Sequence, residues 1–476
     1  MHTVEKIGGS SMSRTQDVLS NIWLHKRNNS LYNRIFVVSA YAGVTDLLLE
    51  HKKSGDAGVY SCFAEASQAD AWRDRLSNVQ QHLLSINRSL FQGKSLQQAN
   101  TFIAERIKGA EQCMQSLYDL CHYGHFQLDS QLATVREMLA SIGEVHSAFN
   151  SVLLLKENGI QARLVDLTGW NLDIPLSFEE MIRTQFSDVN PAKEIVIATG
   201  YTHCNEGLMK TFDRGYSEMT FSKIACITGA TEAIIHKEFH LSSADPRIVG
   251  EDKVITLGMT NFDVADQLSN LGMEAIHPKA ARGLRHAGIQ LRIKNTFEPR
   301  HNGTLISQSY QNPRPCIEII AGRRDVFGIE VFDQDMLGSP EHDIEITRLL
   351  HQLKLDLVNK EADANSVTYF TVGNRKKINR VVRLIEEMYP AAEVSVHNIA
   401  MVSAIGSDIK VKGMLAKTVS ALTDADISIL SLHQTQRQVE MQCIVADNDY
   451  ENAIRTLHKV LIEAEDHGEV IRRSAA

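Results

Sequence analysis

Proline is scarce in this chain and unevenly placed. Nine prolines occur in 476 residues, and none precedes Pro175. Because proline breaks the interior of a helix, its absence permits long helices in this first part. The spacing of apolar residues over 61–158, with few glycines, predicts a helical insertion whose last helix ends at Gly159.

Cysteine pairs and long apolar runs are also missing. The seven cysteines include no CxxC pair and are an odd number, which favours a reducing compartment over a disulfide framework. No apolar run approaches the roughly 18 residues that a membrane span requires. The N-terminal residues lack a charged segment followed by an apolar one. We therefore expect a cytoplasmic protein with no membrane partner.

The chain has no long basic cluster. Its net charge is -9, with 43% hydrophobic and 22% charged residues, which is ordinary globular usage. Nucleic acid binding needs a clustered basic surface, so we expect no nucleic acid partner. A length prior of roughly 150 residues per domain predicts about three folding units.

Several motifs of known chemistry are absent. The sequence contains no GxxxxGK[ST] element and no HRD or DFG set, which excludes the P-loop and protein-kinase plans. The 19 histidines form no metal-ligand pattern; His122 and His125 could share a helix face, but surface histidines are the simpler interpretation. We predict no resident metal site.

Strand-like and helix-like segments alternate in the first part of the chain. RIFVVSA (34–40), ARLVDL (162–167) and EIVIATGY (194–201) have the composition of buried strands, which predicts a mostly parallel α/β sheet. QNPRP (311–315) is typical of a linker, and shorter α+β units follow it. Shared patterning alone could explain the likeness between these later units.

Two glycine-bearing segments carry the chemistry. In KIGGSS (6–11), Gly8 and Gly9 let the main chain approach a phosphate, Ser10 and Ser11 offer hydroxyl groups, and Lys6 offers a charge. An isolated Lys-x-Gly-Gly turn is more often a plain loop.

The second segment is DRGYSEMTFSKIA (213–225). A guanidinium beside a glycine turn, as at Arg214, suits bidentate capture of a carboxylate or phosphate. Ser217 and Glu218 stand where a helix would begin, and Glu218 could equally be an ordinary acidic residue of a first turn. Together the two segments predict phosphoryl transfer.

These segments resemble the aspartate kinases of the amino-acid kinase fold. KIGGSS is similar to the family's Lys-Phe-Gly-Gly-Thr-Ser, and DRGYSE to its Gly-Arg-Gly-Gly-Ser-Asp. Further similar segments, in chain order, are VVSAYAGVTDLL (37–48), GEVHSA (143–148), SADPRIV (243–249), AIHPKA (275–280), KNTFEP (294–299) and GTLI (303–306). The part after residue 316 resembles two ACT domains.

The resemblance implies a fold and a reaction. The fold is a three-layer α/β/α kinase domain with a mostly parallel sheet (1–306), a linker (307–315) and two α+β ACT domains (316–396 and 397–470). The reaction is ATP-dependent phosphorylation of the β-carboxylate of L-aspartate to 4-phospho-L-aspartate, with Mg²⁺ arriving on the nucleotide. An aspartate carboxylate is already ionised at neutral pH, so its attack needs no general base.

The resemblance also assigns residues. Lys6, Arg214 and Glu218 would form the catalytic set, and Lys6 would stabilise the transferred phosphoryl group. The substrate would be held by Ser39, Thr45, Glu144, Arg214, Gly215 and Ser217, with Glu144 taking its α-ammonium group. ATP would be held by Lys6, Gly8, Gly9, Ser10, Ser242, Asp245 and Arg247.

Some positions depart from the family pattern. Asp213, Tyr216 and Glu218 replace smaller residues of the glycine motif, which predicts a differently shaped site. Further departures on the nucleotide side are Ile235, His236, Lys237, Ser242 and Glu274. The opening MHTVEKIGGSSM is similar to aspartate kinases dedicated to ectoine synthesis.

Two alternatives stay open at this point. One keeps the fold but phosphorylates another carboxylate or a carbamate, and the other is a catalytically silent ACT-type regulator. ACT domains further imply a homodimer or larger homo-oligomer and a possible amino-acid effector.

Overall fold

The computed structural model describes residues 1–27, 30–51, 54–65, 71–123, 125, 127–170, 172, 176–212, 215–273, 276–334, 340–434 and 436–464. The chain forms two compact units. The first combines Met1–His240 with Ile276–Gln308, and the second combines Leu241–Ala275 with Ser309–Ala476. Each unit is described by itself.

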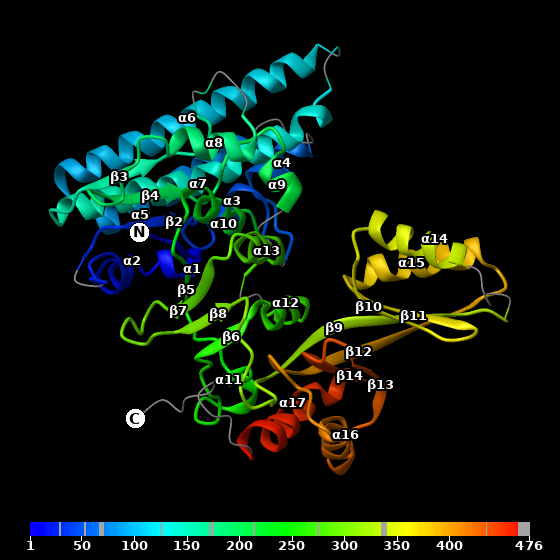
Figure 1. Ribbon diagram of the computed structural model, residues 1–476. Coiled ribbons are helices and arrows are strands. Elements are labelled where there is room, and N and C mark those ends of the chain that lie inside the picture. Colours follow the sequence, from blue (N-terminus) through cyan, green and yellow to red (C-terminus); the bar gives the residue numbers. More distant parts are fainter. Residues whose placement is uncertain are drawn as a thin grey trace. The chain divides into compact units, whose positions relative to one another are not determined.

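The first unit is built on a mostly parallel sheet (Figure 1). Its strands are β1 (Thr3–Ile7), β2 (Arg34–Val38), β3 (Ala162–Val165), β4 (Ile195–Thr199), β5 (Glu232–Lys237), β7 (Gln290–Asn295) and β8 (Thr304–Ser307). They lie in the order β3-β4-β2-β1-β5-β7-β8. Every described pair is parallel except β7 with β8. All residues of β2 and β4 are buried, as their apolar composition predicts.

Helices cover this sheet. They are α1 (Gly9–Met12), α2 (Thr15–Val18), α3 (Val44–Leu48), α4 (Val59–Ala64), α5 (Ala71–Leu90), α6 (Gly93–His122), α7 (Asp129–Glu157), α8 (Phe178–Gln185), α9 (Leu208–Phe212), α10 (Tyr216–Thr228) and α13 (Pro278–His286), with a π-helix η1 (Leu19–Trp23). Helix α7 packs on β2, β3 and β4, and α10 packs on β1, β2 and β5. The sheet and its helices confirm the predicted α/β/α class.

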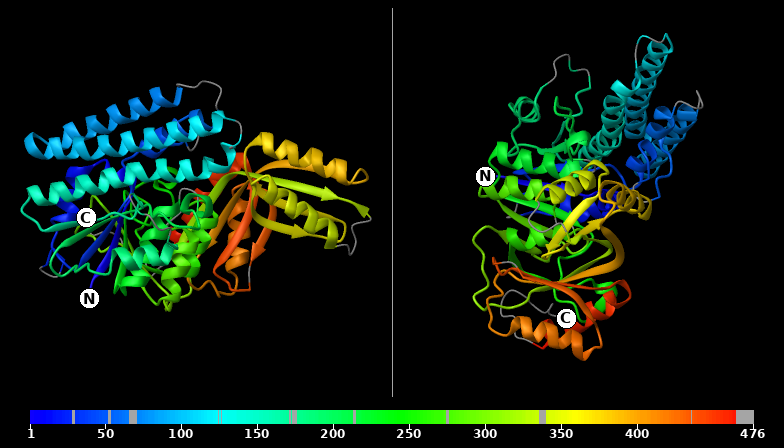
Figure 2. Two further views of the ribbon diagram at one scale, coloured as in Figure 1. Left: turned by 90° about the horizontal axis from the view of Figure 1, so that it is seen from above. Right: turned by 90° about the vertical axis from the view of Figure 1, so that its right-hand side faces the viewer.

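Three long helices form the proline-free part of the unit. Helices α5, α6 and α7 lie side by side in both views of Figure 2. Gly159 follows α7 in the left-handed region, with φ of 73°, and ends the helix as predicted. Among the described helices, Gln131–Glu157 has the length and apolar character of a membrane span, but 89% of its apolar window is buried, as in a core helix.

The second unit contains an antiparallel sheet. The elements of the whole second unit are α11 (Pro246–Val249), β6 (Met259–Asn261), α12 (Phe262–Asn270), β9 (Ile319–Phe332), α14 (Pro340–Gln352), β10 (Asp356–Ala362), β11 (Ser366–Val372), α15 (Arg375–Met388), β12 (Glu393–Ile405), α16 (Met414–Asp424), β13 (Ile429–Gln434), β14 (Glu440–Ala446), η4 (Asp447–Asp449), α17 (Tyr450–His458) and η5 (Lys459–Glu463). The strand order is β10-β11-β9-β12-β14-β13. This sheet and its helices confirm the predicted α+β class.

Two long strands, β9 and β12, run through both halves of this sheet. Residues 326–332 of β9 pair with β11 and with the start of β12, whereas residues 319–323 pair with the end of β12. The first residues of β9 therefore lie in the half of the sheet that contains β13 and β14. The segment Leu241–Ala275 joins the same unit, because Ala244 and Val249 are buried in one core with Ile454.

Candidate active site

Lys6 and Glu218 form a buried ion pair at the centre of the first unit. The Lys6 Nζ lies 3.2 Å from the Glu218 Oε1, and both side chains are buried. The other carboxylate oxygen of Glu218 accepts the backbone N–H of His277. Burial alone would raise the pKa of Glu218, but Lys6, Lys237 and the His277 N–H hold it below its ordinary value. Glu218 is thus an ionised partner of Lys6 and not a solvated helix charge.

The glycine-rich turn after β1 packs closely on the loop after β2. A Cβ atom on Gly9 would lie 2.7 Å from the Ala40 carbonyl oxygen, so only glycine fits there. Ser10 is exposed on this turn. Ser11 points elsewhere, because its buried hydroxyl contacts Glu238 at 2.8 Å and Thr296 at 3.0 Å. Ser10 is therefore the hydroxyl of this turn that a ligand can reach.

A cavity of about 430 Å³ opens beside this turn. Its described lining comprises Gly9, Ser10, Ser39, Ala40, Tyr41, Ala42, Gly43, Thr45, Asp46, Glu144, Tyr216 and Ser217. The Ser39 hydroxyl donates to the Ser217 hydroxyl over 3.3 Å, and the Ser147 hydroxyl holds the Ser39 carbonyl at 2.8 Å. The cavity thus brings residues assigned to the phosphates together with residues assigned to the substrate.

Glu144 is a buried carboxylate on α7 with one unsatisfied oxygen. Burial raises its pKa to about 8, although the charge of Lys6 and hydrogen bonds from the Tyr216 hydroxyl and two backbone N–H groups oppose the rise. Its Oε2 has no hydrogen-bond partner in the described structure. A buried oxygen of this kind suits a cationic ligand group such as an ammonium.

Two glycines bring Glu144 into the cavity. A Cβ atom on Gly143 would lie 2.8 Å from the Ala40 Cβ, and one on Gly200 would lie 2.8 Å from the Glu144 Oε2. Helix α7 can therefore approach the ends of β2 and β4 only because these positions lack side chains.

Comparisons with known proteins identify the family. The amino acid kinase family matches residues 1–295, and an ACT domain matches residues 394–459. The aspartate kinase Ask_Ect of Stutzerimonas stutzeri is 65% identical over 473 residues, which is 99% of each chain. The chain belongs to the aspartate kinases.

More distant relatives of the kinase share its length and fold. The lysine-sensitive aspartokinase 3 of Escherichia coli is 24% identical over 97% of this chain and 99% of that protein. The crystal structure of E. coli aspartokinase III in complex with lysine and aspartate superposes with a TM-score of 0.74, at 20% identity over 97% of this chain and 99% of that chain. The Clostridium acetobutylicum aspartate kinase gives a TM-score of 0.70 at 20% identity, over 96% and 100%.

Tyr216 is a contributor to the kinase site that sequence reasoning left without a role. It departs from the family's glycine motif, is buried at the start of α10, and hydrogen-bonds to Glu144. Its ring meets the Tyr201 ring edge-on, with centroids 5.8 Å apart. Its position next to Ser217 in the sequence was the one sign of a role at the site. The structure shows that its hydrogen-bond partner is Glu144.

Gly215, next to Tyr216, has a packing role. It precedes α10, and a Cβ atom there would lie 2.5 Å from the His277 ring, so the close approach of two segments explains this glycine without a ligand. Arg214, Asp213 and Glu274 lie outside the described residues.

The predicted nucleotide residues Ser242, Asp245 and Arg247 lie in the second unit. Asp245 caps α11 by accepting the Arg247 backbone N–H at 2.9 Å, and it also contacts the Arg247 guanidinium at 3.3 Å. The Ser242 hydroxyl donates to the Ala244 carbonyl at 2.8 Å. Within the described part of the chain, no group of three or more His, Cys, Asp or Glu residues could hold a metal ion.

Proposed function

We propose that the chain transfers the γ-phosphoryl group of ATP to the β-carboxylate of L-aspartate, giving 4-phospho-L-aspartate and ADP. The observation that carries this proposal is the Lys6–Glu218 pair beside a cavity in which Glu144 presents an unsatisfied oxygen. The pair supplies a cation for phosphoryl oxygens, and the free Glu144 oxygen in the cavity supplies an acceptor for an amino group.

The chemistry requires positioning more than proton transfer. The substrate carboxylate is already ionised and attacks the γ-phosphorus directly, while the β–γ bridging oxygen leaves with ADP. Lys6 neutralises the charge that spreads over the transferred oxygens. Glu218 holds the Lys6 ammonium in place, and the backbone of Gly8 and Gly9 with the Ser10 hydroxyl binds the phosphates. Mg²⁺ enters bound to ATP as part of the substrate.

The amino-acid substrate is recognised through the charges of its α-ammonium and α-carboxylate groups. The α-ammonium group lies against Glu144 and favours its ionised form, since an adjacent cation lowers the pKa that burial has raised. Ser39, Thr45 and Ser217 donate hydrogen bonds to the substrate. The resemblance further assigns Arg214 and Gly215 to the α-carboxylate, and Ser242, Asp245 and Arg247 to ATP.

The proposal also includes the compartment, the oligomeric state and the pathway of the enzyme. It works in the cytoplasm as a homodimer or larger homo-oligomer joined through the ACT domains, which take an amino-acid effector. The resemblance assigns 1–306 to the kinase, 307–315 to the linker, and 316–396 and 397–470 to the ACT domains, while Leu241–Ala275 packs in the second unit. Its product feeds ectoine synthesis, in agreement with the name of the Stutzerimonas relative.

The test is an acyl-phosphate trap. Protein with Mg-ATP, L-aspartate and hydroxylamine should yield aspartyl hydroxamate and an equal amount of ADP. Glu144→Gln should raise the KM for aspartate more than the KM for ATP, because it removes only the partner of the ammonium group. Hydroxamate from another carboxylate but none from aspartate would identify a different kinase. No product with any carboxylate would identify a silent regulator.

A further inference from the structure

A second cavity of about 390 Å³ lies in the first unit, separate from the Lys6 site. Its described lining comes from η1 and the loop after it, β1, β2, β5, and the end of β7 with its following loop: Glu5, Asn21, Ile22, His25, Lys26, Arg27, Arg34, Ile234, His236, Lys294, Asn295, Thr296, Pro299, Arg300 and Asn302. Glu5 and Lys6 are neighbours on β1, so their side chains point to opposite faces of the sheet. None of the described residues lining the cavity beside Glu144 lines this one.

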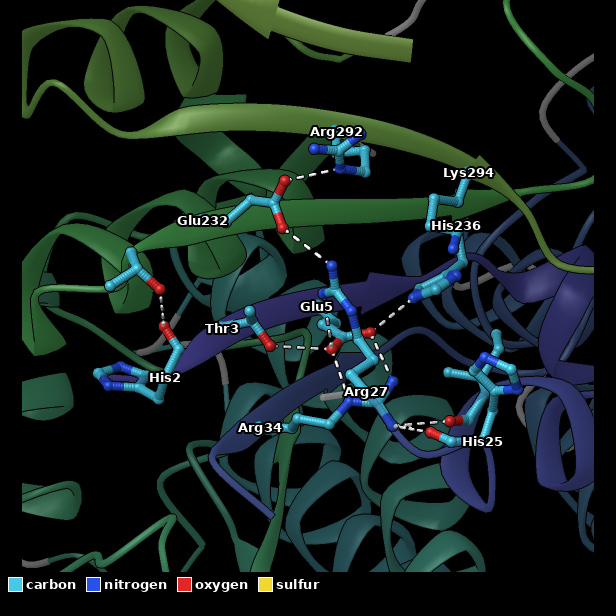
Figure 3. Close-up of polar contacts among 12 residues, drawn as sticks. His2, Thr3, Glu5, His25, Arg27, Arg34, Glu232, His236, Arg292 and Lys294 are labelled. Carbon is cyan, nitrogen blue, oxygen red and sulfur yellow. Dashed lines mark hydrogen bonds and ion pairs between the residues drawn. The ribbon is translucent and has the colours of Figure 1, made fainter. Parts of the chain in front are cut away.

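The described lining is strongly cationic. Five side chains carry a positive charge, namely Lys26, Arg27, Arg34, Lys294 and Arg300, and Glu5 is the carboxylate among them. Figure 3 shows Arg27, Arg34 and His236 gathered around Glu5. The cavity wall therefore has a surplus of positive charge.

Glu5 is already fully engaged and cannot neutralise this surplus. Its carboxylate accepts the Arg34 guanidinium through two hydrogen bonds of 2.7 and 2.9 Å, and it meets the His236 Nε2 at 2.8 Å. It is fully buried, but Arg34 and His236 hold its pKa well below its ordinary value.

Arg27 is paired through its Nη2 with Glu232 at 3.1 Å, but other donor nitrogens of the lining remain open. Within the described residues, the hydrogen bond recorded for the Lys294 ammonium goes to the Pro299 carbonyl, at 3.2 Å. Burial and the charges of Arg27, Arg292 and Arg34 lower the pKa of Lys294 in spite of Glu5. The Arg27 Nη1 and the Nδ1 of buried His236 have no hydrogen-bond partner in the described structure. The Arg27 Nη1 and the Lys294 Nζ can each donate to an oxyanion, whereas the proton of neutral His236 lies on the Nε2 that donates to Glu5.

We propose that this cavity binds a small multivalent oxyanion, a phosphate or sulfate group, between Lys294, Arg27 and Arg300. Charge-assisted hydrogen bonds from a guanidinium and an ammonium are the usual means of holding such a group. The anion supplies the missing counter-charge, so binding stabilises the folded protein.

Thr296 connects the site to the glycine-rich turn. It lines the cavity, and its hydroxyl contacts the Ser11 hydroxyl at 3.0 Å while its carbonyl accepts from the Asn21 side chain at 3.1 Å. Thr296 therefore links the anion-binding cavity directly to Ser11, in the turn proposed to hold ATP.

The test measures phosphate and sulfate binding by calorimetry and by thermal unfolding, against sodium chloride at matched ionic strength. Wild type should bind each anion saturably and gain thermal stability, whereas chloride should have little effect. The double variant Lys294→Gln/Arg300→Gln should bind about tenfold more weakly or worse, since each lost charged donor costs affinity. Its unfolding midpoint in chloride should stay close to that of wild type, because neither side chain has a carboxylate partner in the described structure.

Two further arms identify the site. The control Lys193→Gln/Arg282→Gln removes the same charge from exposed positions and should bind like wild type. Lys6→Ala should also bind like wild type; loss of binding there would move the anion to the Lys6 turn and overturn the proposal. Crystals soaked in selenate should show an anomalous peak within hydrogen-bond distance of Lys294 and Arg27. No peak in this cavity, or unchanged affinity in the Lys294→Gln/Arg300→Gln variant, would equally refute it.

Discussion

At the scale of single residues, the site depends on buried charges that satisfy one another only in part. Lys6 and Glu218 are paired, while Glu144 keeps one oxygen free and has a pKa that burial raises. A protein that bound no ligand here would gain stability by filling this space with apolar groups. The unsatisfied Glu144 oxygen is thus best explained by a charged substrate.

Replacing Lys6 should affect both the turnover rate and the stability of the protein, and the two effects can be measured separately. Lys6→Ala should lower kcat by about 10²- to 10³-fold, because one preorganised charge is lost from the transition state. It should also cost about 1 to 3 kcal/mol of unfolding free energy, since Glu218 would remain buried without its partner. Steady-state kinetics and urea unfolding measure the two effects.

The double variant Lys6→Ala/Glu218→Gln is the control. It should recover part of the lost stability, because the buried charge is gone, but none of the activity. Recovery of turnover would contradict a catalytic role for Lys6.

Glu144 should give the protein a distinct pH dependence. Its folded pKa of about 8 lies above the ordinary glutamate value. The folded state therefore holds a proton that the unfolded state has released, and this contribution to stability is full at low pH and is lost as pH rises through about 8. Unfolding free energy measured between about pH 5 and pH 8.5 should fall more steeply in wild type than in Glu144→Gln. Parallel curves would show that Glu144 titrates normally.

At the scale of elements, the site depends on how closely α7 approaches the loop after β2 and the start of α3. The contact is made at Gly143, where an added Cβ would lie 2.8 Å from the Ala40 Cβ and 2.9 Å from the Val44 Cγ1. Gly143→Ala should therefore destabilise the protein by about 1 to 3 kcal/mol and raise the KM for aspartate, because α7 must shift and take Glu144 with it.

Thr134→Ala is the matched control on the same helix. Thr134 is exposed, so this change should leave both KM and stability nearly unchanged. If Gly143→Ala behaved in the same way, the proposed close packing of α7 would be wrong.

The elements themselves were largely predictable. The missing prolines predicted long helices, and α5, α6 and α7 supply them; β-branched runs predicted β2 and β4. The pairing of residues 319–323 with the end of β12 was not predicted, because strand partners far apart in sequence leave no local pattern.

At the scale of the whole molecule, the two units are interleaved in sequence. Leu241–Ala275 lies between segments of the first unit but buries Ala244, Val249 and Leu257 within the second. Cutting the chain after Gln308 should therefore leave a fragment with exposed apolar surface. Such a fragment should bind a hydrophobic dye and aggregate in size-exclusion chromatography, whereas the full chain should not. A soluble, monodisperse fragment would contradict this division of the core.

The sequence alone determined the reaction type and most of the elements, because local composition controls helices, strands and glycine turns, and ordered motifs mark the family. Only the tertiary structure decided the partners: Glu218 beside Lys6, Tyr216 beside Glu144, and five cations around a second cavity. Those partners come from segments far apart in the chain, and the pKa and affinity of a buried group depend on what folding places next to it.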